Sequence, residues 1–343
     1  MSEGVLYRKY RPQKFSQVLG QNHVLTVLEG ALKQGNISHA YLFSGSRGTG
    51  KTSVARIFAR AVGCSENDLY EIDAASNRGI DDIRQIKESV TSMPFDSKYK
   101  VYIVDEVHML TKEAFNALLK TLEEPPAHVI FILATTEMEK LPETVISRCQ
   151  TFTFKKPNQE ILKKTLIDVA KKEGFTLDSA SADLIALLSE GSFRDALGIL
   201  QKVIISSTDK KVSLQEVEAV IGAPKGVLVN SIIECISGKN LSGALVAVRK
   251  GTEANLDMKI LLKLLIRNIR FILLLRFAPE MEESIKEELT QEDYIFLKKL
   301  GASKESGISS ATLNELLGAY ENMYRAYIPE LPLELVLIKI IGV

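Results

Sequence analysis

Tryptophan is absent from this 343-residue sequence, cysteine occurs only three times, and neither sign of charge is in excess. Cys64, Cys149 and Cys235 lie far apart, which excludes a disulfide framework and a C-x-x-C metal motif and favours reduced thiols in the cytoplasm. Basic and acidic side chains number 43 each. This balance removes the argument for a globally basic nucleic-acid binder, although it excludes neither DNA nor a nucleotide as a partner.

The sequence also lacks an uncharged hydrophobic run long enough to span a membrane. Residues 260–278 form the most apolar stretch, but they include four basic residues, Lys263, Arg267, Arg270 and Arg276. A membrane span of about 20 residues tolerates no such density of charge, so we expect a long amphipathic helix here. The first four residues lack the basic and apolar regions of a secretory signal. We therefore expect a soluble, cytoplasmic protein without a membrane partner.

The first 157 residues alternate short apolar runs with helical patterns, which predicts an α/β fold with a parallel sheet and crossover helices. We expect strands at residues 40–43, 69–72, 101–104, 129–133 and 151–154. Helices are expected near residues 22–34, 51–62, 79–91 and 111–123. After residue 157 we expect the strands to cease, because the apolar residues then follow helical spacing through a small region, 158–222, and a larger one, 223–343.

One segment fits the phosphate-binding pattern G-x-x-x-x-G-K-[ST] at every fixed position. It lies between an expected strand and an expected helix, and it consists of Gly45, Ser46, Arg47, Gly48, Thr49, Gly50, Lys51 and Thr52, with Ser53 next in the helix. Glycines let the backbone N–H groups turn inward around phosphate oxygens, and the helix N-terminus adds its positive dipole end. We expect Lys51 to contact the β and γ phosphates of ATP and Thr52 to ligate Mg²⁺.

An acidic pair, Asp105 and Glu106, follows the apolar strand at 101–104. The carboxyl ends of strands in a doubly wound sheet are where ligands bind. We expect Asp105 to hold the Mg²⁺ shell and Glu106 to orient or deprotonate the water that attacks the γ-phosphate. A pair of acids, rather than a single aspartate, favours hydrolysis over simple nucleotide holding.

Several further segments accompany these motifs, namely LYRKYRP at 6–12, DAASN at 73–77, DEVHML at 105–110, FNALLKTLEEPP at 115–126, LATT at 133–136 and ISRC at 146–149. Together they resemble the AAA+ core of the clamp loaders, most specifically the gamma/tau family of bacterial DNA polymerase III. The similarity covers nearly the whole chain. It implies a nucleotide-binding domain at 1–157, a helical lid domain at 158–222 and an all-helical oligomerising collar at 223–343, in which helices 260–278 and 311–326 bury either a neighbour's surface or an intrachain core.

The resemblance also implies roles for single residues around the nucleotide. Arg148 matches the family's arginine finger, which would act on a neighbouring subunit's γ-phosphate, and either Thr135 or Thr136 matches the first sensor. Arg194 matches the second sensor. Ser192 is expected to cap the helix that follows, which places Arg194 in the first turn. The helix dipole disfavours a cation there unless the cation faces an anion, so we expect Arg194 to face a phosphate. Residues expected around the adenine are Tyr7, Arg11, Val18 and Leu19. His108 is expected to be structural.

As partners the resemblance implies delta-type and delta-prime-type subunits, several copies of the chain itself, a sliding clamp and primer–template DNA. Asn77 and Arg78 are the candidates for DNA contact. Where the family usually carries a four-cysteine zinc module, this sequence keeps Cys64 alone, so no zinc is expected. The complete phosphate loop disfavours a non-hydrolysing, stator-type subunit, and the Ser147-Arg148-Cys149 segment disfavours a branch-migration helicase.

Overall fold

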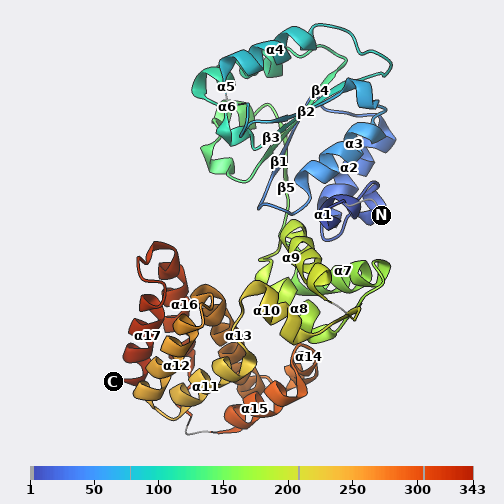
Figure 1. Ribbon diagram of the computed structural model, residues 1–343. Coiled ribbons are helices and arrows are strands. Elements are labelled where there is room, and N and C mark those ends of the chain that lie inside the picture. The colour runs from blue at the N-terminus through green and yellow to red at the C-terminus, as the bar shows by residue number, and fades with distance from the viewer. Residues whose placement is uncertain (1–3, 78, 208, 304–305, 343) are drawn as a thin grey trace. The chain divides into compact units, whose positions relative to one another are not determined.

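The computed structural model describes residues 4–77, 79–207, 209–303 and 306–342, and the chain divides into two compact units (Figure 1). The first unit comprises Met1–Leu162 together with Ser189–Gly198, and the second comprises Lys163–Leu188 and Ile199–Val343. The short segment 189–198 thus belongs with the amino-terminal unit, although it lies far from it in sequence. The division into three domains at residues 157 and 222 stays a prediction.

A five-stranded parallel sheet of order β2-β3-β4-β1-β5 forms the centre of the first unit. Its strands are β1 (Ala40–Ser44), β2 (Leu69–Asp73), β3 (Lys100–Asp105), β4 (Val129–Thr135) and β5 (Gln150–Thr153). The three central strands are buried on both faces, whereas β2 lies at an edge and is largely accessible. All five predicted strands are confirmed, and the three central ones are continuous apolar runs, as expected of strands covered on both faces.

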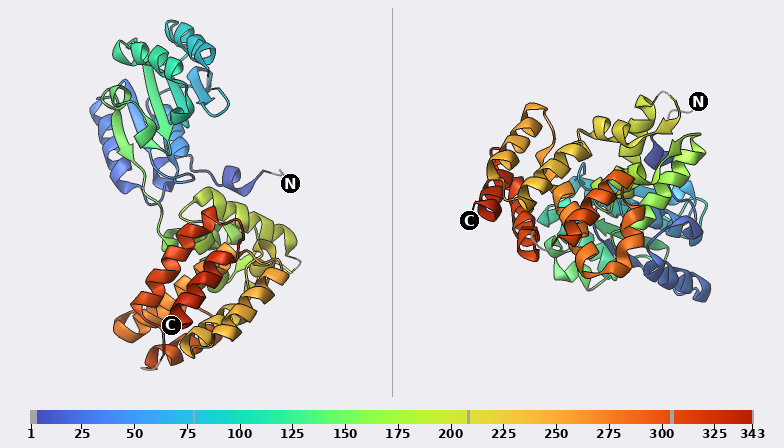
Figure 2. Two further views of the ribbon diagram at one scale, coloured as in Figure 1. Left: turned by 90° about the vertical axis from the view of Figure 1, so that its left-hand side faces the viewer. Right: turned by 90° about the horizontal axis from the view of Figure 1, so that it is seen from below.

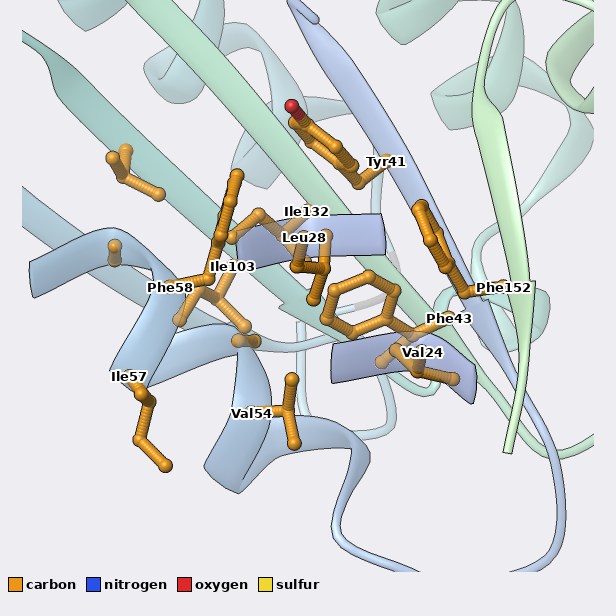
Figure 3. Packing of buried hydrophobic residues seen from close by; sticks show 14 of the residues in the cluster. Val24, Leu28, Tyr41, Phe43, Val54, Ile57, Phe58, Ile103, Ile132 and Phe152 are labelled. Carbon is orange, nitrogen blue, oxygen red and sulfur yellow. The ribbon is translucent and has the colours of Figure 1, made fainter. Parts of the chain in front are cut away.

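Helices cover both faces of this sheet, and each face has its own apolar cluster. On one face α2 (Asn22–Gln34) and α3 (Lys51–Ala61) pack against it, and Tyr41 and Phe58 meet edge to face at 4.8 Å (Figure 3). On the other face lie α4 (Ile80–Val90), α5 (Lys112–Glu123) and the single turn α6 (Glu143–Ile146) (Figure 1). The four helices predicted between the strands are thus confirmed, and a further turn, α1 (Leu6–Lys9), precedes them.

The remaining regular structure is mainly helical. The helices are α7 (Gln159–Lys172), α8 (Ser179–Leu188), α9 (Phe193–Ser206), α10 (Leu214–Ile221), α11 (Gly226–Ser237), α12 (Leu241–Glu253), α13 (Met258–Phe277), α14 (Glu282–Glu287), α15 (Gln291–Ala302), α16 (Ser310–Asn322) and α17 (Leu331–Ile341). Short 3-10 turns lie at Phe15–Gln17, Glu66–Asp68, Val107–Met109, Met138–Lys140, Pro279–Met281 and Met323–Arg325. Within the second unit α16 and α17 pack side by side, as both views of the red helices show (Figures 1 and 2).

The expectation that strands cease after residue 157 is wrong. Two further strands, β6 (Thr176–Leu177) and β7 (Lys211–Val212), pair in parallel in the second unit. The Thr176 amide also donates to the Lys210 carbonyl over 2.9 Å. Because each strand contains only two residues, neither leaves a periodic signal in the sequence.

The charges of α13 have specific partners inside the second unit. Arg267 pairs with the buried Asp183 over 3.0 Å, and Arg276 donates to the carbonyl groups of Gly301 and Ile308 over 3.1 and 2.8 Å. The predicted long helix is confirmed. Among the described residues no single helix has the length and apolar character needed to cross a membrane, and one bent pair, α10 with α11, meets that standard by length and composition.

Candidate functional site

The loop between β1 and α3 carries the predicted phosphate-binding pattern, and its glycines adopt conformations that other residues avoid. Gly45, Gly48 and Gly50 have φ values of 142°, 74° and 104°. A Cβ on Gly45 would lie 2.4 Å from the Phe154 carbonyl oxygen. The backbone at Gly45 therefore lies closer to Phe154 than a residue with a side chain would permit. The loop ends where α3 begins, at Lys51.

Lys51 is buried within this loop, with 5% of its surface exposed. Its Nζ donates to the carbonyl groups of Gly45 and Ser46 over 2.7 and 3.0 Å, and Thr49 Oγ1 also donates to Ser46 over 2.9 Å. Burial lowers the pKa of Lys51, while the charges of Glu106 and Asp105 act in the opposite direction. The ammonium group therefore sits in the concave side of the loop, facing two carboxylates.

The first turn of α3 meets the carboxyl end of β3. Thr52 Oγ1 donates to Asp105 Oδ2 over 2.6 Å. The next residue, Ser53, accepts a hydrogen bond of 2.9 Å from Arg11 Nε. Burial lowers the pKa of Arg11, and the neighbouring Arg56 acts in the same direction. The structure thus brings together the expected magnesium ligands and one residue from the expected adenine set.

Glu106 follows Asp105 in a left-handed conformation, with φ of 49°. Such a conformation is uncommon for a residue with a side chain, and it directs Glu106 differently from the strand before it. Thr136 Oγ1 donates to Glu106 Oε2 over 3.0 Å. Thr135 is fully buried at the end of β4, and its Oγ1 lies 3.0 Å from His108 Nδ1. Both sensor candidates therefore stand beside the acidic pair, each with a different partner.

The amino-terminal end of α9 lies directly against the phosphate-binding loop. The Phe193 amide donates to the Gly48 carbonyl over 3.0 Å, and a Cβ on Gly48 would lie 2.0 Å from Ser192 Oγ. Ser192 caps the helix as predicted, since its Oγ accepts from the Asp195 amide over 3.2 Å. This contact explains why residues 189–198 belong to the first unit.

Arg194 occupies the first turn of α9, and its guanidinium carbon lies 4.9 Å from the centre of the Tyr7 ring. The guanidinium group of Arg194 thus meets an aromatic face, which attracts a cation, and its contact with a phosphate stays a prediction. A hydrogen bond from Arg8 lowers the pKa of Tyr7, and burial opposes that effect. Val18 is buried behind the preceding turn and Leu19 is exposed.

Arg148 lies apart from the phosphate-binding loop of its own chain. Its Nη2 pairs with Glu123 Oε1 over 2.6 Å, and its Nη1 donates to the Thr144 carbonyl over 2.7 Å. Of the two DNA-contact candidates, Asn77 donates through its amide and its side chain to the Asp73 carbonyl over 2.9 and 3.0 Å. Arg78 lies outside the described residues.

Three residues of the site were missed in the sequence. Gln21 is fully buried, and its Nε2 donates to the Lys155 and Thr49 carbonyl groups over 2.7 and 3.4 Å. It therefore links the phosphate-binding loop to the segment that follows β5. His108 Nε2 lies 3.1 Å from Glu137 Oε1, beside the acidic pair. A buried glutamine before a helix and a glutamate after a strand carry no local signal in the sequence, and the sequence predicts only a structural role for His108.

The oxygen atoms of Thr52 and Asp105 fit a magnesium ion bound to nucleotide. Mg²⁺ is usually held by one or two protein oxygens, with water and phosphate completing its octahedron. Across the described part of the chain, no group of three or more histidine, cysteine or acidic side chains could hold a metal ion by itself. Cys64 is buried, and burial raises the pKa of its thiol to about 11.

Sheet order, loop and acidic pair together define a P-loop nucleotide-binding domain of the AAA+ class. A solved structure with this fold is the Thermotoga maritima RuvB Holliday junction branch migration motor, with a TM-score of 0.53 and 21% identity over 66% of this chain and 79% of that one. This similarity confirms the predicted α/β P-loop fold with helical regions following it.

Sequence comparison shows which proteins of this class the chain is similar to. Residues 20–78 and 67–158 match the family described as DNA polymerase III, delta subunit. The chain is 41% identical to DNA polymerase III subunit tau of Bacillus subtilis, over 86% of this chain and 56% of the relative, and 38% identical to subunit tau of Escherichia coli, over 81% and 46%. With the gamma/tau subunit of Mycoplasma pneumoniae it shares 43% identity over 62% of this chain and 34% of the relative. The chain is therefore similar in sequence to the tau and gamma/tau subunits of bacterial DNA polymerase III, and it spans between about a third and somewhat more than half of the length of these three relatives.

Proposed function

We propose that this chain is an ATP-hydrolysing subunit of the bacterial replicative clamp loader, acting in the cytoplasm as part of DNA polymerase III. The observation that carries the proposal is the contact of 2.6 Å between Thr52 Oγ1 and Asp105 Oδ2, with Lys51 and Glu106 beside it. A hydrolysing site needs a phosphate-binding lysine, magnesium ligands and a carboxylate for the water in one place. Homology to tau and gamma/tau subunits supports the biological setting.

In this proposal each residue of the loop has a defined task. The backbone N–H groups of residues 45–53 surround the phosphates, and Lys51 contacts the β and γ phosphates. Thr52 and Asp105 hold Mg²⁺, which neutralises the charge of the phosphates when bound. Glu106 accepts the proton of the attacking water, and Thr136 holds one oxygen of Glu106 through its hydroxyl group.

The adenine and the lid side of the nucleotide involve other residues. Tyr7, Arg11, Val18 and Leu19 surround the base in this proposal, and the contact between Arg11 and Ser53 links them to the loop. Arg194 moves from the Tyr7 ring to the γ-phosphate when the nucleotide binds. Because the Phe193 amide donates to the Gly48 carbonyl, movement of the loop reaches α9 directly.

Arg148 supplies an arginine finger in trans. Its guanidinium group is held by Glu123 and the Thr144 carbonyl, away from the loop of the same chain, so its proposed target is a γ-phosphate on a neighbouring subunit. A planar, permanently charged guanidinium group suits the charge that develops on the phosphoryl oxygens. Efficient hydrolysis then requires the assembled complex.

The proposed assembly contains several copies of this chain with delta-type and delta-prime-type subunits. It opens a sliding clamp and releases it on primer–template DNA, with Asn77 and Arg78 contacting the duplex backbone. Contacts to the DNA backbone are sequence-independent and salt-sensitive, so a chain with no net charge is compatible with them. ATP and Mg²⁺ are the proposed cofactors, and zinc is not among them.

ATP hydrolysis by the reconstituted complex, measured with and without clamp and primed DNA, tests the proposal. We expect DNA and clamp to stimulate hydrolysis, and Lys51→Ala to abolish ATP binding. A Lys51→Ala chain that binds ATP normally would instead indicate a scaffold subunit. Translocation on DNA without clamp opening would indicate a branch-migration motor.

A further inference from the structure

His108 lies at the centre of a polar network that joins the two sensor candidates to Glu106. Its side chain is buried, with 5% of its surface exposed, on the 3-10 turn after β3. Nδ1 lies 3.0 Å from Thr135 Oγ1 and 3.6 Å from Glu106 Oε2, whereas Nε2 lies 3.1 Å from Glu137 Oε1. One imidazole ring therefore contacts Thr135 at the end of β4 and Glu137, two residues beyond it, beside the proposed base.

The hydrogen-bond partners of this ring accommodate one neutral tautomer, with the hydrogen on Nε2. The Glu137 carboxylate can only accept, so Nε2 carries a hydrogen. Thr135 Oγ1 already accepts from the Glu137 amide over 3.0 Å, which leaves the hydroxyl hydrogen free to point at Nδ1. With a neutral ring, protonated Nε2 donates to Glu137 Oε1 and unprotonated Nδ1 accepts from the Thr135 hydroxyl group.

The second oxygen of Glu137 keeps the carboxylate in place. Lys140 Nζ pairs with Glu137 Oε2 over 2.6 Å, so Oε1 is left for the ring. The hydrogen bond from Lys140 lowers the pKa of Glu137, and burial opposes that effect. The charged groups that face the ring are thus Glu106 and Glu137 directly, with Lys140 behind Glu137.

We propose that His108 is a positioning residue for the hydrolytic reaction. Its ring is held by Glu137 and fixes the Thr135 hydroxyl group. The ring also limits where the Glu106 carboxylate can lie, although it donates no hydrogen bond to Glu106. The inference rests on the proposed function, since it assigns His108 a part in ATP hydrolysis by Glu106. Glu106 Oε2 then accepts from Thr136 alone among these side chains and keeps its other oxygen for water. His108 contacts no residue of the loop at 45–52 in this network, so nucleotide affinity does not depend on it.

Two substitutions test the two ring nitrogens of His108 separately. The amide of His108→Asn reaches the position of Nδ1 and keeps an acceptor for Thr135, whereas that of His108→Gln reaches the position of Nε2 and keeps a donor for Glu137. We expect kcat of the reconstituted complex to fall by about tenfold to a hundredfold in His108→Gln and less in His108→Asn. The dissociation constant for ATP stays within about twofold in both. Equal losses of kcat in the two variants, or a loss that follows ATP affinity, would overturn the proposal.

A double-mutant cycle asks whether His108 acts through Thr135. Once Thr135→Val has removed the hydroxyl group, a further His108→Gln change should lower kcat no more, because residues that act as a unit are not additive. Fully additive losses would contradict positioning through Thr135. Glu137→Gln keeps an acceptor at the surface of the network and should give an intermediate kcat with an unchanged melting temperature.

A spectroscopic measurement is independent of activity. The chain contains four histidines, so ¹⁵N-histidine labelling with His108→Gln as the assignment control identifies the His108 ring signals. At about pH 8 we expect protonated Nε2 and unprotonated Nδ1 in the His108 ring. A hydrogen on Nδ1 would overturn the network. If the tautomer is as expected but the wild-type complex does not hydrolyse ATP, the proposed function fails and the proton arrangement stands.

Discussion

Thr52 Oγ1 and Asp105 Oδ2 lie 2.6 Å apart, so a hydroxyl group in the first turn of α3 and a carboxylate at the end of β3 form one oxygen pair. The two residues come from separate motifs of the sequence. The pair lies beside Lys51, which Asp105 and Glu106 both face. Phosphate binding, metal binding and water activation are therefore proposed within one small region at the carboxyl edge of the sheet.

Replacing Asp105 by asparagine tests the metal role of this pair. Asparagine keeps an oxygen that can accept from Thr52, but it removes the charge that attracts Mg²⁺. We expect the affinity for ATP in the presence of Mg²⁺ to fall about tenfold or more. Without Mg²⁺ it should stay level or rise, because a negative charge near the phosphates is gone. Calorimetric titration with Mg²⁺ and with a chelator measures both values.

Thr52→Ser is the matched control, since it keeps the hydroxyl group and should retain Mg²⁺-dependent affinity. Equal losses of affinity with and without Mg²⁺ in Asp105→Asn would show that Asp105 supports the loop rather than the metal.

Replacing Gly48 by alanine should destabilise the first unit and weaken ATP binding. The new Cβ would lie 2.0 Å from Ser192 Oγ, and the φ of 74° disfavours any side chain. The backbone strain alone costs about 1–2 kcal/mol. Urea unfolding and ATP titration measure the two effects. Adding Ser192→Gly should recover part of the loss by removing the clash, while the strain remains.

Gly198→Ala, in α9, is the control for a glycine-to-alanine change away from the contact between Ser192 and Gly48. Apart from the adjoining backbone of its own helix, no atom of the residues that the structure describes lies within 4 Å of the position of its Cβ. A glycine inside a helix costs about 0.5–1 kcal/mol relative to alanine. We therefore expect Gly198→Ala to raise the free energy of unfolding. If Gly48→Ala is as stable as the wild type, the close approach of α9 to the loop is not maintained in solution.

Asp68 makes the stability of the first unit depend on pH. It is fully buried and accepts hydrogen bonds from the amide groups of Phe95, Asp96 and Ser97 over 2.6, 3.1 and 3.0 Å. Burial acts to raise the pKa of Asp68, but these bonds and one from the Ser97 hydroxyl group outweigh it and hold the pKa well below its usual range. A lowered folded-state pKa stabilises the fold above the ordinary aspartate value of about 4, and this contribution is lost as the pH falls below it.

Asp68→Asn should therefore lower the free energy of unfolding by about 2 kcal/mol at neutral pH, because the new NH₂ group would face hydrogen-bond donors. Because asparagine does not titrate, the free energy of unfolding should also decline less steeply in acid. Urea unfolding at several pH values between neutral and about pH 3 follows both changes. Glu88→Gln, at an exposed position of α4, should leave the curve unchanged. An unaltered acid limb in Asp68→Asn would exclude Asp68 as its source.

Arg148→Ala in the assembled complex tests the finger in trans. DNA-stimulated hydrolysis should fall about a thousandfold, since a single arginine supplies that much stabilisation in related phosphoryl-transfer sites. ATP affinity of the isolated chain should not change, because Arg148 contacts Glu123 and Thr144 rather than its own loop. Arg249→Ala, which removes an ion pair whose arginine side chain is 79% exposed, is the neutral comparison. Undiminished stimulation in Arg148→Ala would refute the finger.

Local patterns were enough to predict the five strands of the parallel sheet and the helices between them. Buried parallel strands are continuous apolar runs, and the phosphate-binding loop is contiguous in the chain, so both are visible without any tertiary contact. The two-residue strands β6 and β7 were missed because pairing between distant segments, rather than side-chain pattern, creates them. Similarly, the stacking of Arg194 on Tyr7 depends on where α1 lies, which no local rule contains.

By itself the sequence determined the α/β class, the order of the elements and the chemistry present, since glycines, a lysine and an acid pair at fixed spacing carry their own physical requirements. Tertiary structure decided which of these groups meet. Parallel pairing places the ends of β1, β3 and β4 at one edge, and that alignment brings Thr52 to Asp105 and His108 to Thr135. The approach of Ser192 to Gly48 likewise joins residues far apart in the chain, because packing energy, rather than sequence proximity, selects such contacts.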